Sequence, residues 1–393
     1  MTLWVTFRMP ENNMRFSTRA IHVGQPPEPL TGAVNVPIFL STTFAQASPG
    51  KSKGFVYGRT GNPTRAVLER TIAELEGGKA GLAFSSGLGA LVTLVESIGS
   101  RQRIVAIDDV YGGTWRLLDH HHRKFGVDVE FVDMTRIDSV RAALARARTD
   151  LVYLESPTNP LLRVVDIRAI SRLSHAAGAH VAVDNTFATP ALQRPLELGA
   201  DIVLHSTTKY LGGHSDVLGG ALAFRDPRLA RRFAWLQNTV GAVPSPFDSF
   251  LILRGIHTLG IRMRAHEASA RAVAEVLERS SKVRATYYPG LASHPQHRIA
   301  RRQMSGFGGM VSFELANAGA AGRFARALRI FTLAESLGGV ESLADHPASM
   351  THASVPPEIR RARGVRDGLI RLSCGIEDPA DLADDVGRAL RRV

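Results

Sequence analysis

Short apolar runs alternate with helical patterns through the middle of the chain, from about residue 80 to residue 225. Seven such runs are followed by polar, charged or glycine residues, and they lie at 81–84, 104–107, 129–132, 151–154, 180–183, 202–205 and 221–224. Stretches with helical spacing, such as 139–147 and 167–177, lie between several of them. Alternation of this kind predicts a mostly parallel sheet covered by helices.

The two ends of the chain have different patterns. Residues 1–65 contain many turn formers and little periodicity, and a helical pattern begins only after Pro63. A segment this long without a core of its own usually lies on something else. We therefore expect 1–65 to form an arm that lies on its own subunit or on a neighbouring one.

The C-terminal part combines longer amphipathic helices with a second group of strands. We predict amphipathic helices over 254–277, strands at 309–315 and 369–373, and a closing helix from Asp381. This pattern indicates a smaller α+β domain. The predicted division is an N-terminal arm (1–65), an α/β domain (66–255) and a C-terminal domain (256–393).

Composition is that of an ordinary globular protein, with 44% hydrophobic and 21% charged residues among 393. No apolar run approaches the roughly 20 residues that cross a bilayer. The N-terminal sequence MTLWVTFRMPENNMRF has charges and a proline where a signal peptide needs an apolar core. We therefore expect a cytoplasmic protein without a membrane partner. The single cysteine, Cys374, excludes an internal disulfide and a thiolate metal cluster, and we expect it to be packed at a strand end.

A net charge of +12 raises the question of a nucleic-acid partner. The arginines are dispersed over many helical stretches, and no recognised nucleic-acid module is present. We therefore predict no nucleic-acid partner and interpret the basic residues as solvated helix faces that attract anionic substrates. A basic binding protein without catalytic activity is the competing hypothesis.

Polar residues follow several predicted strands, where parallel sheets bind their ligands. Ser86-Gly87-Leu88-Gly89 opens a helix, whose free N–H groups can bind phosphate. Asp184 ends another strand, where it can face a protonated ring nitrogen or cap the next helix. Tyr111 can stack on a planar cofactor or fill core space.

Lys209 follows the strand at 202–205 and is one of only six lysines among 48 basic residues. Lysine, unlike arginine, readily becomes a neutral amine when it is desolvated. We expect Ser206 and Thr208 to lie on the same face of an extended segment. Their hydroxyls can hold an anionic group attached to that amine, and a phosphate-bearing aldehyde fits such a site. The alternative is an ordinary surface lysine that caps the strand.

Other cofactor motifs are missing from the sequence. No strand is followed by a GxGxxG turn with an acidic residue about 20 positions on, which argues against a dehydrogenase. The GGHSD sequence at 212–216 lacks the Gly-Lys-Ser/Thr of a phosphate-binding loop. The run 120–122 consists of three histidines, but consecutive helical residues cannot converge on one ion. We therefore predict no metal site.

At this point the chain resembles a known family. The matching stretches are YGRTGNPTR (57–65), FSSGLGA (84–90), DDVYGGTWRL (108–117), ESPTNPLL (155–162), VDNTFATP (183–190), HSTTKYLGGHSDVLGG (205–220), FTLAESLGGVESL (331–343), HPASMTHA (346–353) and LIRLSCGIED (369–378). They are similar to the Cys/Met-metabolism (trans-sulfuration) family of pyridoxal-phosphate enzymes, from about residue 17 to the C-terminus.

The resemblance implies the aspartate-aminotransferase-like fold (fold type I), with a seven-stranded central sheet in the cofactor-binding domain. It also implies a homotetramer built from dimers with shared active sites. Lys209 would carry pyridoxal 5'-phosphate covalently, Asp184 would pair with the ring nitrogen and Tyr111 would stack on the ring. The residues that the resemblance places around the phosphate are Gly87, Leu88, Ser206 and Thr208, with Tyr57 and Arg59 from the neighbouring subunit.

The resemblance also assigns the substrate side of the site. Asn159, Ser336 and Arg371 would hold the α-carboxylate of an amino-acid substrate. The chain departs from the common family pattern at Leu88, where methionine is usual, at Gly212, where asparagine is frequent, and at His257, where lysine is frequent. These departures affect substrate preference more than cofactor binding.

The expected chemistry is cleavage or formation of a carbon–sulfur bond. Lys209 would take the α-proton, and Tyr111 would donate a proton to the leaving group. Glu335 resembles the acidic residue of cystathionine γ-synthases and γ-lyases and would hold the distal amino group. We therefore expect γ-elimination from cystathionine or γ-replacement of an O-acylhomoserine by cysteine. An O-acylhomoserine sulfhydrylase and a methionine γ-lyase are the alternatives.

Overall fold

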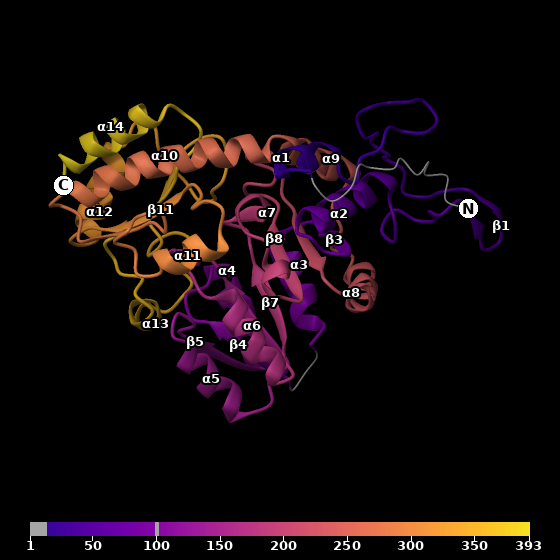
Figure 1. Cartoon of the computed structure of the whole chain (residues 1–393), viewed down its shortest axis with the longest axis horizontal. Coiled ribbons are helices and arrows are strands. Elements are labelled where there is room, and N and C mark those ends of the chain that lie inside the picture. Colours follow the sequence, from indigo (N-terminus) through magenta and orange to yellow (C-terminus); the bar gives the residue numbers. More distant parts are fainter. Residues whose placement is uncertain (1–13, 99–101) are drawn as a thin grey trace.

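A computed structural model describes residues 14–98 and 102–393. Figure 1 shows an N-terminal arm, a central sheet with its helices, and a C-terminal group of helices and strands at the opposite end from the arm. The stretch that argues against a signal peptide lies mostly in 1–13, outside the described residues.

The central sheet has seven strands in the order β3-β9-β8-β7-β6-β4-β5. All run in one direction except β9, which is antiparallel to both of its neighbours. The strands are β3 (Ala80–Phe84), β4 (Arg103–Ile107), β5 (Asp128–Val132), β6 (Leu151–Glu155), β7 (His180–Asp184), β8 (Ile202–Ser206) and β9 (Gly220–Phe224). The mostly parallel, seven-stranded sheet is confirmed, with every strand end within one residue of its predicted position.

Helices cover this sheet and share one large apolar core with it. They are α2 (Pro63–Leu75), α3 (Gly87–Glu96), α4 (Gly112–Phe125), α5 (Ile137–Arg146), α6 (Ile167–Ala176), α7 (Thr189–Leu192), η1 (Pro195–Leu198), α8 (Pro227–Val240) and α9 (Pro246–His257). Helix α3 contacts β8, β9 and α4, while α6 contacts β7 and α5. The predicted helices at 139–147 and 167–177 correspond to α5 and α6.

The C-terminal part has a separate core around a five-stranded sheet of order β10-β11-β14-β13-β12. Its elements are α10 (Leu259–Arg279), β10 (Ala285–Tyr287), α11 (His297–Gln303), β11 (Met310–Glu314), α12 (Ala318–Ala327), β12 (Thr332–Leu333), β13 (Leu343–Asp345), α13 (Pro357–Ala362), β14 (Leu369–Ser373) and α14 (Pro379–Leu390). Helices α10 and α14 pack on each other, as Figure 1 shows. The smaller α+β domain is therefore confirmed, although its predicted boundary at residue 256 stays a prediction.

The helices predicted over 254–277 correspond to the end of α9 and most of α10, with a break at Thr258 that the pattern did not locate. Arg262, which is 4% exposed, donates from Nη2 to the Gly255 carbonyl at 2.6 Å and from Nε to Thr258 Oγ1 at 3.0 Å. Its Nη1 donates to the carbonyl of Tyr210 at 2.7 Å. The buried guanidinium of Arg262 thus supplies hydrogen bonds to the last turn of α9. The apolar periodicity of the sequence continues across Thr258, so the local pattern does not predict the break.

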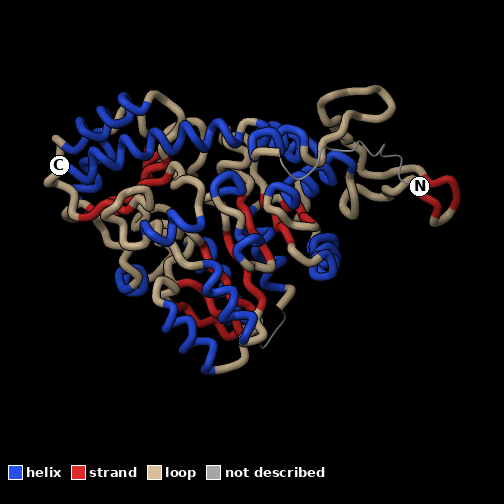
Figure 2. The backbone as a smooth tube through the Cα atoms, viewed as in Figure 1, coloured by secondary structure: helices blue, strands red, loops and turns tan. Residues whose placement is uncertain are grey.

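The arm contains one helix, α1 (Phe16–His22), and a small hairpin of β1 (Gln46–Ser48) and β2 (Lys51–Ser52). Helix α1, which the sequence pattern did not predict, contacts α2, α9 and α10 and buries Ala20 completely. The rest is mostly loop, with the hairpin at its tip (Figure 2). Leu30 is 93% exposed and Val34 85% exposed in the single chain. Part of the arm therefore packs on its own subunit, and part of it lies free.

Two further predictions concern Cys374 and membrane-spanning helices. Cys374 follows β14 and is fully buried, which confirms that it is packed, and burial raises the pKa of its thiol. Within the described part of the chain, no helix combines the length and the apolar character that spanning a bilayer requires.

Candidate active site

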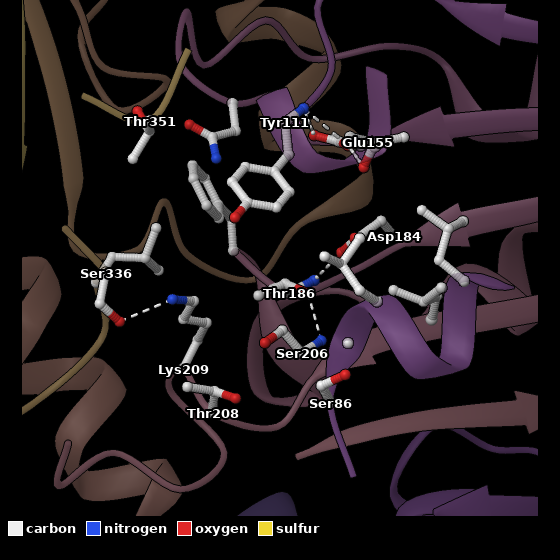
Figure 3. A pocket seen from close by; sticks show the side chains of 18 of the residues that line it. Ser86, Tyr111, Glu155, Asp184, Thr186, Ser206, Thr208, Lys209, Ser336 and Thr351 are labelled. Atoms are coloured by element: carbon white, nitrogen blue, oxygen red, sulfur yellow. Dashed lines mark hydrogen bonds between the residues drawn. The ribbon is translucent and has the colours of Figure 1, made fainter. Parts of the chain in front are cut away.

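A cavity of about 360 Å³ lies at the carboxyl ends of the parallel strands. Residues from β6, β7, β8 and α3 line it together with the loop after β12 and a residue of β14. Eleven of the thirteen predicted site residues line this cavity, namely Gly87, Leu88, Tyr111, Asn159, Asp184, Ser206, Thr208, Lys209, Glu335, Ser336 and Arg371. Figure 3 shows several of them pointing toward one another. The fold therefore brings together strand ends that are far apart in the sequence.

Lys209 lies in the turn that follows β8, and its Nζ donates to Ser336 Oγ at 2.7 Å (Figure 3). Burial and then the positive charge of Arg371 lower the pKa of Lys209 to about 8, against the opposing effects of Glu335 and Asp345. The amine is thus partly neutral near physiological pH, and a neutral amine can react with an aldehyde.

The hydroxyls near Lys209 are arranged differently from the sequence expectation. Strand β8 ends at Ser206, so Thr208 lies in a turn and not on the same face of an extended segment. Thr208 Oγ1 accepts from the Gly219 N–H at 3.0 Å, which holds this turn against the start of β9. Both residues nevertheless line the cavity.

The first turn of α3 faces Ser206. A Cβ added to Gly87 would lie 2.9 Å from Ser206 Cβ, so only glycine lets these two backbones approach so closely. Ser86 caps the helix by accepting from the Gly89 N–H at 3.0 Å. The N–H groups of a first turn have no partners within their helix and favour an anion. This corner of the cavity therefore suits a phosphate.

Asp184 ends β7 and does not cap the next helix, because Ala188 holds the N-cap position of α7. Its Oδ1 accepts from the Thr186 N–H at 2.9 Å, and the Tyr153 hydroxyl lies 3.4 Å from Oδ2. Burial raises the pKa of Asp184, while the bonds from Thr186 oppose that rise. A cationic ring nitrogen would offset the cost of burying this carboxylate.

Tyr111 occupies the N-cap position of α4, is 37% exposed and lines the cavity. Its side chain makes no capping bond, so the ring is available to a ligand. It does not fill core space, which was the alternative expectation.

Arg371, on β14, is 2% exposed and lines the cavity from the small domain. Its Nη1 donates to Asn159 Oδ1 at 2.7 Å, and its Nη2 donates to the Ser336 carbonyl at 3.1 Å. Asp345 lies 3.4 Å from Nη2. The Nε atom has no hydrogen-bond partner in the described part of the chain. An unpaired guanidinium N–H beside a cavity suits a carboxylate ligand.

The loop after β12 brings two predicted residues to the cavity. Ser336 has a φ of +90°, a strained conformation for a residue with a side chain, and this places its hydroxyl on Lys209. Glu335 is exposed and lines the opening.

Tyr57 and Arg59 do not line the cavity of their own chain. Tyr57 is 47% exposed, and the Arg59 guanidinium lies 5.6 Å from the centre of its ring. Arg59 Nη1 donates to the Asn238 carbonyl at 2.5 Å. Their predicted role in a neighbouring subunit's site is not tested by a single chain.

Four polar residues that line the cavity had no role in the sequence interpretation: Thr114, Glu155, Thr186 and Thr351. Glu155 and Thr186 follow predicted strand cores in the sequence, so position alone was a signal for both. Thr186 Oγ1 accepts from the Ser206 N–H at 2.9 Å and so links the ends of β7 and β8. Thr351 had only the resemblance of its surrounding sequence as a signal.

The structure accommodates the residues at which the chain departs from the common family pattern. A Cβ on Gly212 would lie 2.9 Å from the Thr207 carbonyl, so a larger residue requires a backbone shift here. His257 Nε2 donates to the Gln25 side-chain oxygen (Oε1) of the arm at 2.7 Å. His121 contacts the Leu117 carbonyl and Glu96. Among the described residues, no three or more His, Cys, Asp and Glu side chains are placed to hold a metal ion.

These features fit pyridoxal phosphate as a group. An amine of lowered pKa, a glycine-lined helix start, a buried carboxylate and an accessible aromatic ring surround one cavity. Each has a matching chemical group on that cofactor: the aldehyde, the phosphate, the ring nitrogen and the ring face.

Comparison with known proteins gives the family. The model of the Cys/Met metabolism PLP-dependent enzymes matches residues 17–391. A cystathionine beta-lyase of Lactococcus lactis subsp. cremoris is 52% identical over 95% of this chain and 98% of its own length. A cystathionine gamma-lyase of Dictyostelium discoideum is 50% identical over 96% of this chain and 98% of its own.

A solved structure agrees with the sequence matches. The cystathionine gamma synthase of Xanthomonas oryzae pv. oryzae, in complex with aminoacrylate and cysteine, superposes with a TM-score of 0.94 at 46% identity. The match covers 97% of this chain and 99% of that one. The family match over almost the whole chain, and relatives at this level of identity, leave no ambiguity: the chain belongs to the Cys/Met metabolism family of PLP-dependent enzymes.

Proposed function

We propose that this enzyme acts on the carbon–sulfur chemistry of cystathionine, by γ-elimination to cysteine, 2-oxobutanoate and ammonia or by γ-replacement of an O-acylhomoserine with cysteine. The observation that carries the proposal is the Lys209 amine, which lies in the cavity with its pKa lowered to about 8. Relatives with cystathionine-handling names support the substrate class.

The cofactor residues keep the roles that the sequence predicted. Lys209 would hold the cofactor covalently, and Asp184 would face its ring nitrogen. Gly87 and Leu88 offer N–H groups to the phosphate, and Ser206 and Thr208 offer hydroxyls to it. The substitution of leucine for the usual methionine at Leu88 is tolerable because the backbone N–H is the group that binds. The lining of the cavity by these residues supports this assignment.

Proton transfer falls to two side chains. Bound pyridoxal phosphate supplies an electron-withdrawing ring that stabilises negative charge at Cα of the attached amino acid. Lys209 would take the proton from Cα with its neutral amine, and loss of a further proton from Cβ would allow the bond between Cγ and sulfur to break. The Tyr111 hydroxyl donates a proton to the departing sulfur in elimination.

Substrate orientation depends on residues from both domains. Arg371 binds the α-carboxylate, with its unpaired Nε as the free donor, and Asn159 and Ser336 fix the guanidinium. Glu335, at the cavity opening, binds the distal ammonium group of cystathionine. This residue favours reaction at Cγ in our proposal.

Cleavage on the Cβ side is the second candidate, because the Lactococcus lactis relative is named a cystathionine beta-lyase. The two cleavages give different products from cystathionine. Cleavage at Cγ gives cysteine and 2-oxobutanoate, whereas cleavage at Cβ gives homocysteine and pyruvate, each with ammonia. An O-acylhomoserine sulfhydrylase and a methionine γ-lyase require sulfide or methionine as substrate.

A product assay tests the proposal. Purified enzyme with pyridoxal phosphate receives cystathionine alone, then an O-acylhomoserine with cysteine, then with sulfide, and finally methionine. We expect 2-oxobutanoate in the first assay or cystathionine in the second at the highest kcat/KM. Preference for sulfide or methionine, or pyruvate as the main keto acid, would contradict the proposed reaction. A colourless protein that gains no visible band with the cofactor would instead support the basic binding protein.

We also propose that Tyr57 and Arg59 complete the phosphate shell in a neighbouring subunit, within a homotetramer of two dimers. The absence of both residues from the lining of their own cavity, and the exposed apolar residues of the arm, support this arrangement. The cytoplasmic location expected from the sequence stays a prediction.

A further inference from the structure

Two carboxyl groups lie side by side at the base of the cavity. Glu155 ends β6 and Asp184 ends β7, and the two residues are register partners in a parallel pair of strands. Both line the cavity, as Figure 3 shows. The Tyr153 hydroxyl lies 3.5 Å from Glu155 Oε1 and 3.4 Å from Asp184 Oδ2. A single ring nitrogen pairs with one carboxylate, so the second must have another use.

Glu155 is bonded to the start of α4. Its two carboxyl oxygens each lie 3.1 Å from the Tyr111 backbone nitrogen, which donates to them. The Thr114 hydroxyl donates to Oε1 at 3.2 Å. Glu155 therefore holds the N-cap residue and the first turn of this helix from a neighbouring strand, where Tyr111 itself provides no side-chain cap.

The same backbone position determines where the Tyr111 ring lies. A Cβ on Gly113 would lie only 2.4 Å from Cε1 of that ring, so the ring rests against the first turn of α4. A Cβ on Gly112 would lie 2.3 Å from the Thr351 carbonyl, so the small domain closes on the other side. With both sides packed, a shift of the Tyr111 backbone moves the ring directly.

We propose that Glu155 is a positioning residue of the active site, which acts through Tyr111 and works as a neutral hydrogen-bonding group. This inference rests on the proposed role of Tyr111 against the cofactor ring. Glu155 is 4% exposed. Burial, and then the nearby Asp184, raise the pKa of Glu155 well above its usual value, with Asp109 adding to the rise. This raised pKa favours the protonated, uncharged form of Glu155 beside Asp184.

Two variants test separately whether the length of the Glu155 side chain and its ability to ionise matter. Glu155→Gln keeps the length and an acceptor oxygen but cannot ionise, whereas Glu155→Asp keeps the carboxyl group but withdraws it by one methylene. We expect pyridoxal phosphate to bind E155Q within threefold of wild type and E155D about tenfold more weakly, since a buried donor loses its partner. The reverse order, with E155D near wild type, would overturn the proposal. The exposed Glu358→Ala serves as a control that leaves affinity unchanged.

A second measurement uses the protein without cofactor. Amide hydrogen exchange at Tyr111 and the first turn of α4 should be about tenfold faster in E155D than in wild type, and nearly unchanged in E155Q. Equal exchange in all three proteins would mean that Glu155 does not hold this backbone.

A double-mutant cycle tests whether Glu155 acts through the Tyr111 ring. In a Tyr111→Ala background, E155D should weaken cofactor binding by less than about twofold, because the ring is absent. Additive losses would contradict the inference. Absence of any visible cofactor band in the wild type would contradict the proposed function instead, and the exchange measurement would still test the contact of Glu155.

Discussion

At the scale of single residues, the proposed chemistry depends on the acid–base state of Lys209. Its pKa of about 8 makes about a tenth of the amine neutral at pH 7 and about a hundredth at pH 6. We expect the rate at which cofactor-free protein reacts with pyridoxal phosphate to rise about tenfold per pH unit up to about pH 8 and then level off. Stopped-flow absorbance measures this rate.

The same measurement has two controls. Lys209→Ala should give no visible band at any pH, and a variant that kept both the band and turnover would contradict the covalent role. Glu335→Gln removes a negative charge that raises the pKa of Lys209, so its plateau should begin at lower pH. A plateau that starts only near pH 10 in the wild type would show that burial does not lower this pKa.

Ser336 illustrates strain at a functional position. Its φ of +90° is unfavourable for any residue with a Cβ and costs of order 1–3 kcal/mol, whereas glycine adopts it freely. We expect Ser336→Gly to be more stable than Ser336→Ala by about 1 kcal/mol in chemical denaturation. Both variants lose the hydroxyl on Lys209, so both should lose turnover. Equal stability, or a more stable alanine variant, would argue against strain.

At the scale of elements, Asp201 joins the starts of β7 and β8 to α6. It accepts from the Val181 N–H at 2.9 Å and lies 2.8 Å from His175 Nε2 and 3.7 Å from His180 Nδ1. Burial opposes ionisation of Asp201, but hydrogen bonds from His180 and His175 outweigh it and hold its pKa below the usual value. The bond to Asp201 raises the pKa of His180.

These opposite shifts predict a pH window for stability. The contribution of Asp201 is present above its unfolded pKa of about 4 and is lost as pH falls through its lower folded pKa. The contribution of His180 is complete below about pH 6.5 and is lost as pH rises through its raised folded pKa. Asp201→Asn should therefore lower stability most between about pH 4 and 6.5, by about 1 kcal/mol given the partial exposure.

Thermal unfolding across pH checks this window. The difference in Tm between wild type and D201N should shrink from pH 5.5 to pH 8.5. Asp119→Asn, which removes an ion pair with Arg123 and no histidine, should show a difference that is flat over the same range. A flat difference for D201N would mean that His180 gains nothing from Asp201.

The elements themselves were largely predictable, for a local reason. An apolar run of four or five residues between polar turns is typical of a strand in a covered sheet. All seven central strands were therefore found from pattern alone, including β5, of which only Val132 is buried. Helix α1 and the break at Thr258 were not. The first is only seven residues long, and the second depends on Arg262, whose partners include Tyr210, distant in the sequence.

At the scale of the whole molecule, the proposed sharing of active sites has a direct test. Arg59→Ala and Lys209→Ala should each be inactive or nearly so as pure proteins. If the arm of one subunit serves the site of another, a mixed dimer has one site with both changes and one with neither. Equal amounts, refolded together, should therefore recover roughly a quarter of wild-type activity.

A second mixture of variants checks that any recovered activity comes from shared active sites. Asp184 and Lys209 line the same cavity of one chain, so Asp184→Ala mixed with Lys209→Ala leaves no intact site and should recover nothing. Recovery in this second mixture, or none in the first, would contradict the shared arrangement.

The sequence by itself determined the strands, the polar residues at their carboxyl ends and the choice of Lys209. Parallel strands must present these ends at one edge, so local pattern is enough to group them. The resemblance of nine stretches to one family added the cofactor and the roles.

Only the tertiary structure decided how the groups meet. The pairing of Glu155 with Asp184 follows from strand register, and the contact of Arg371 with Asn159 spans the two domains. The absence of Tyr57 and Arg59 from their own cavity lining follows from the course of the arm. Such contacts join residues that are far apart in the chain, so they produce no periodic pattern in the sequence. The pattern of apolar residues indicates which side chains are buried, but it does not indicate which other side chains they contact.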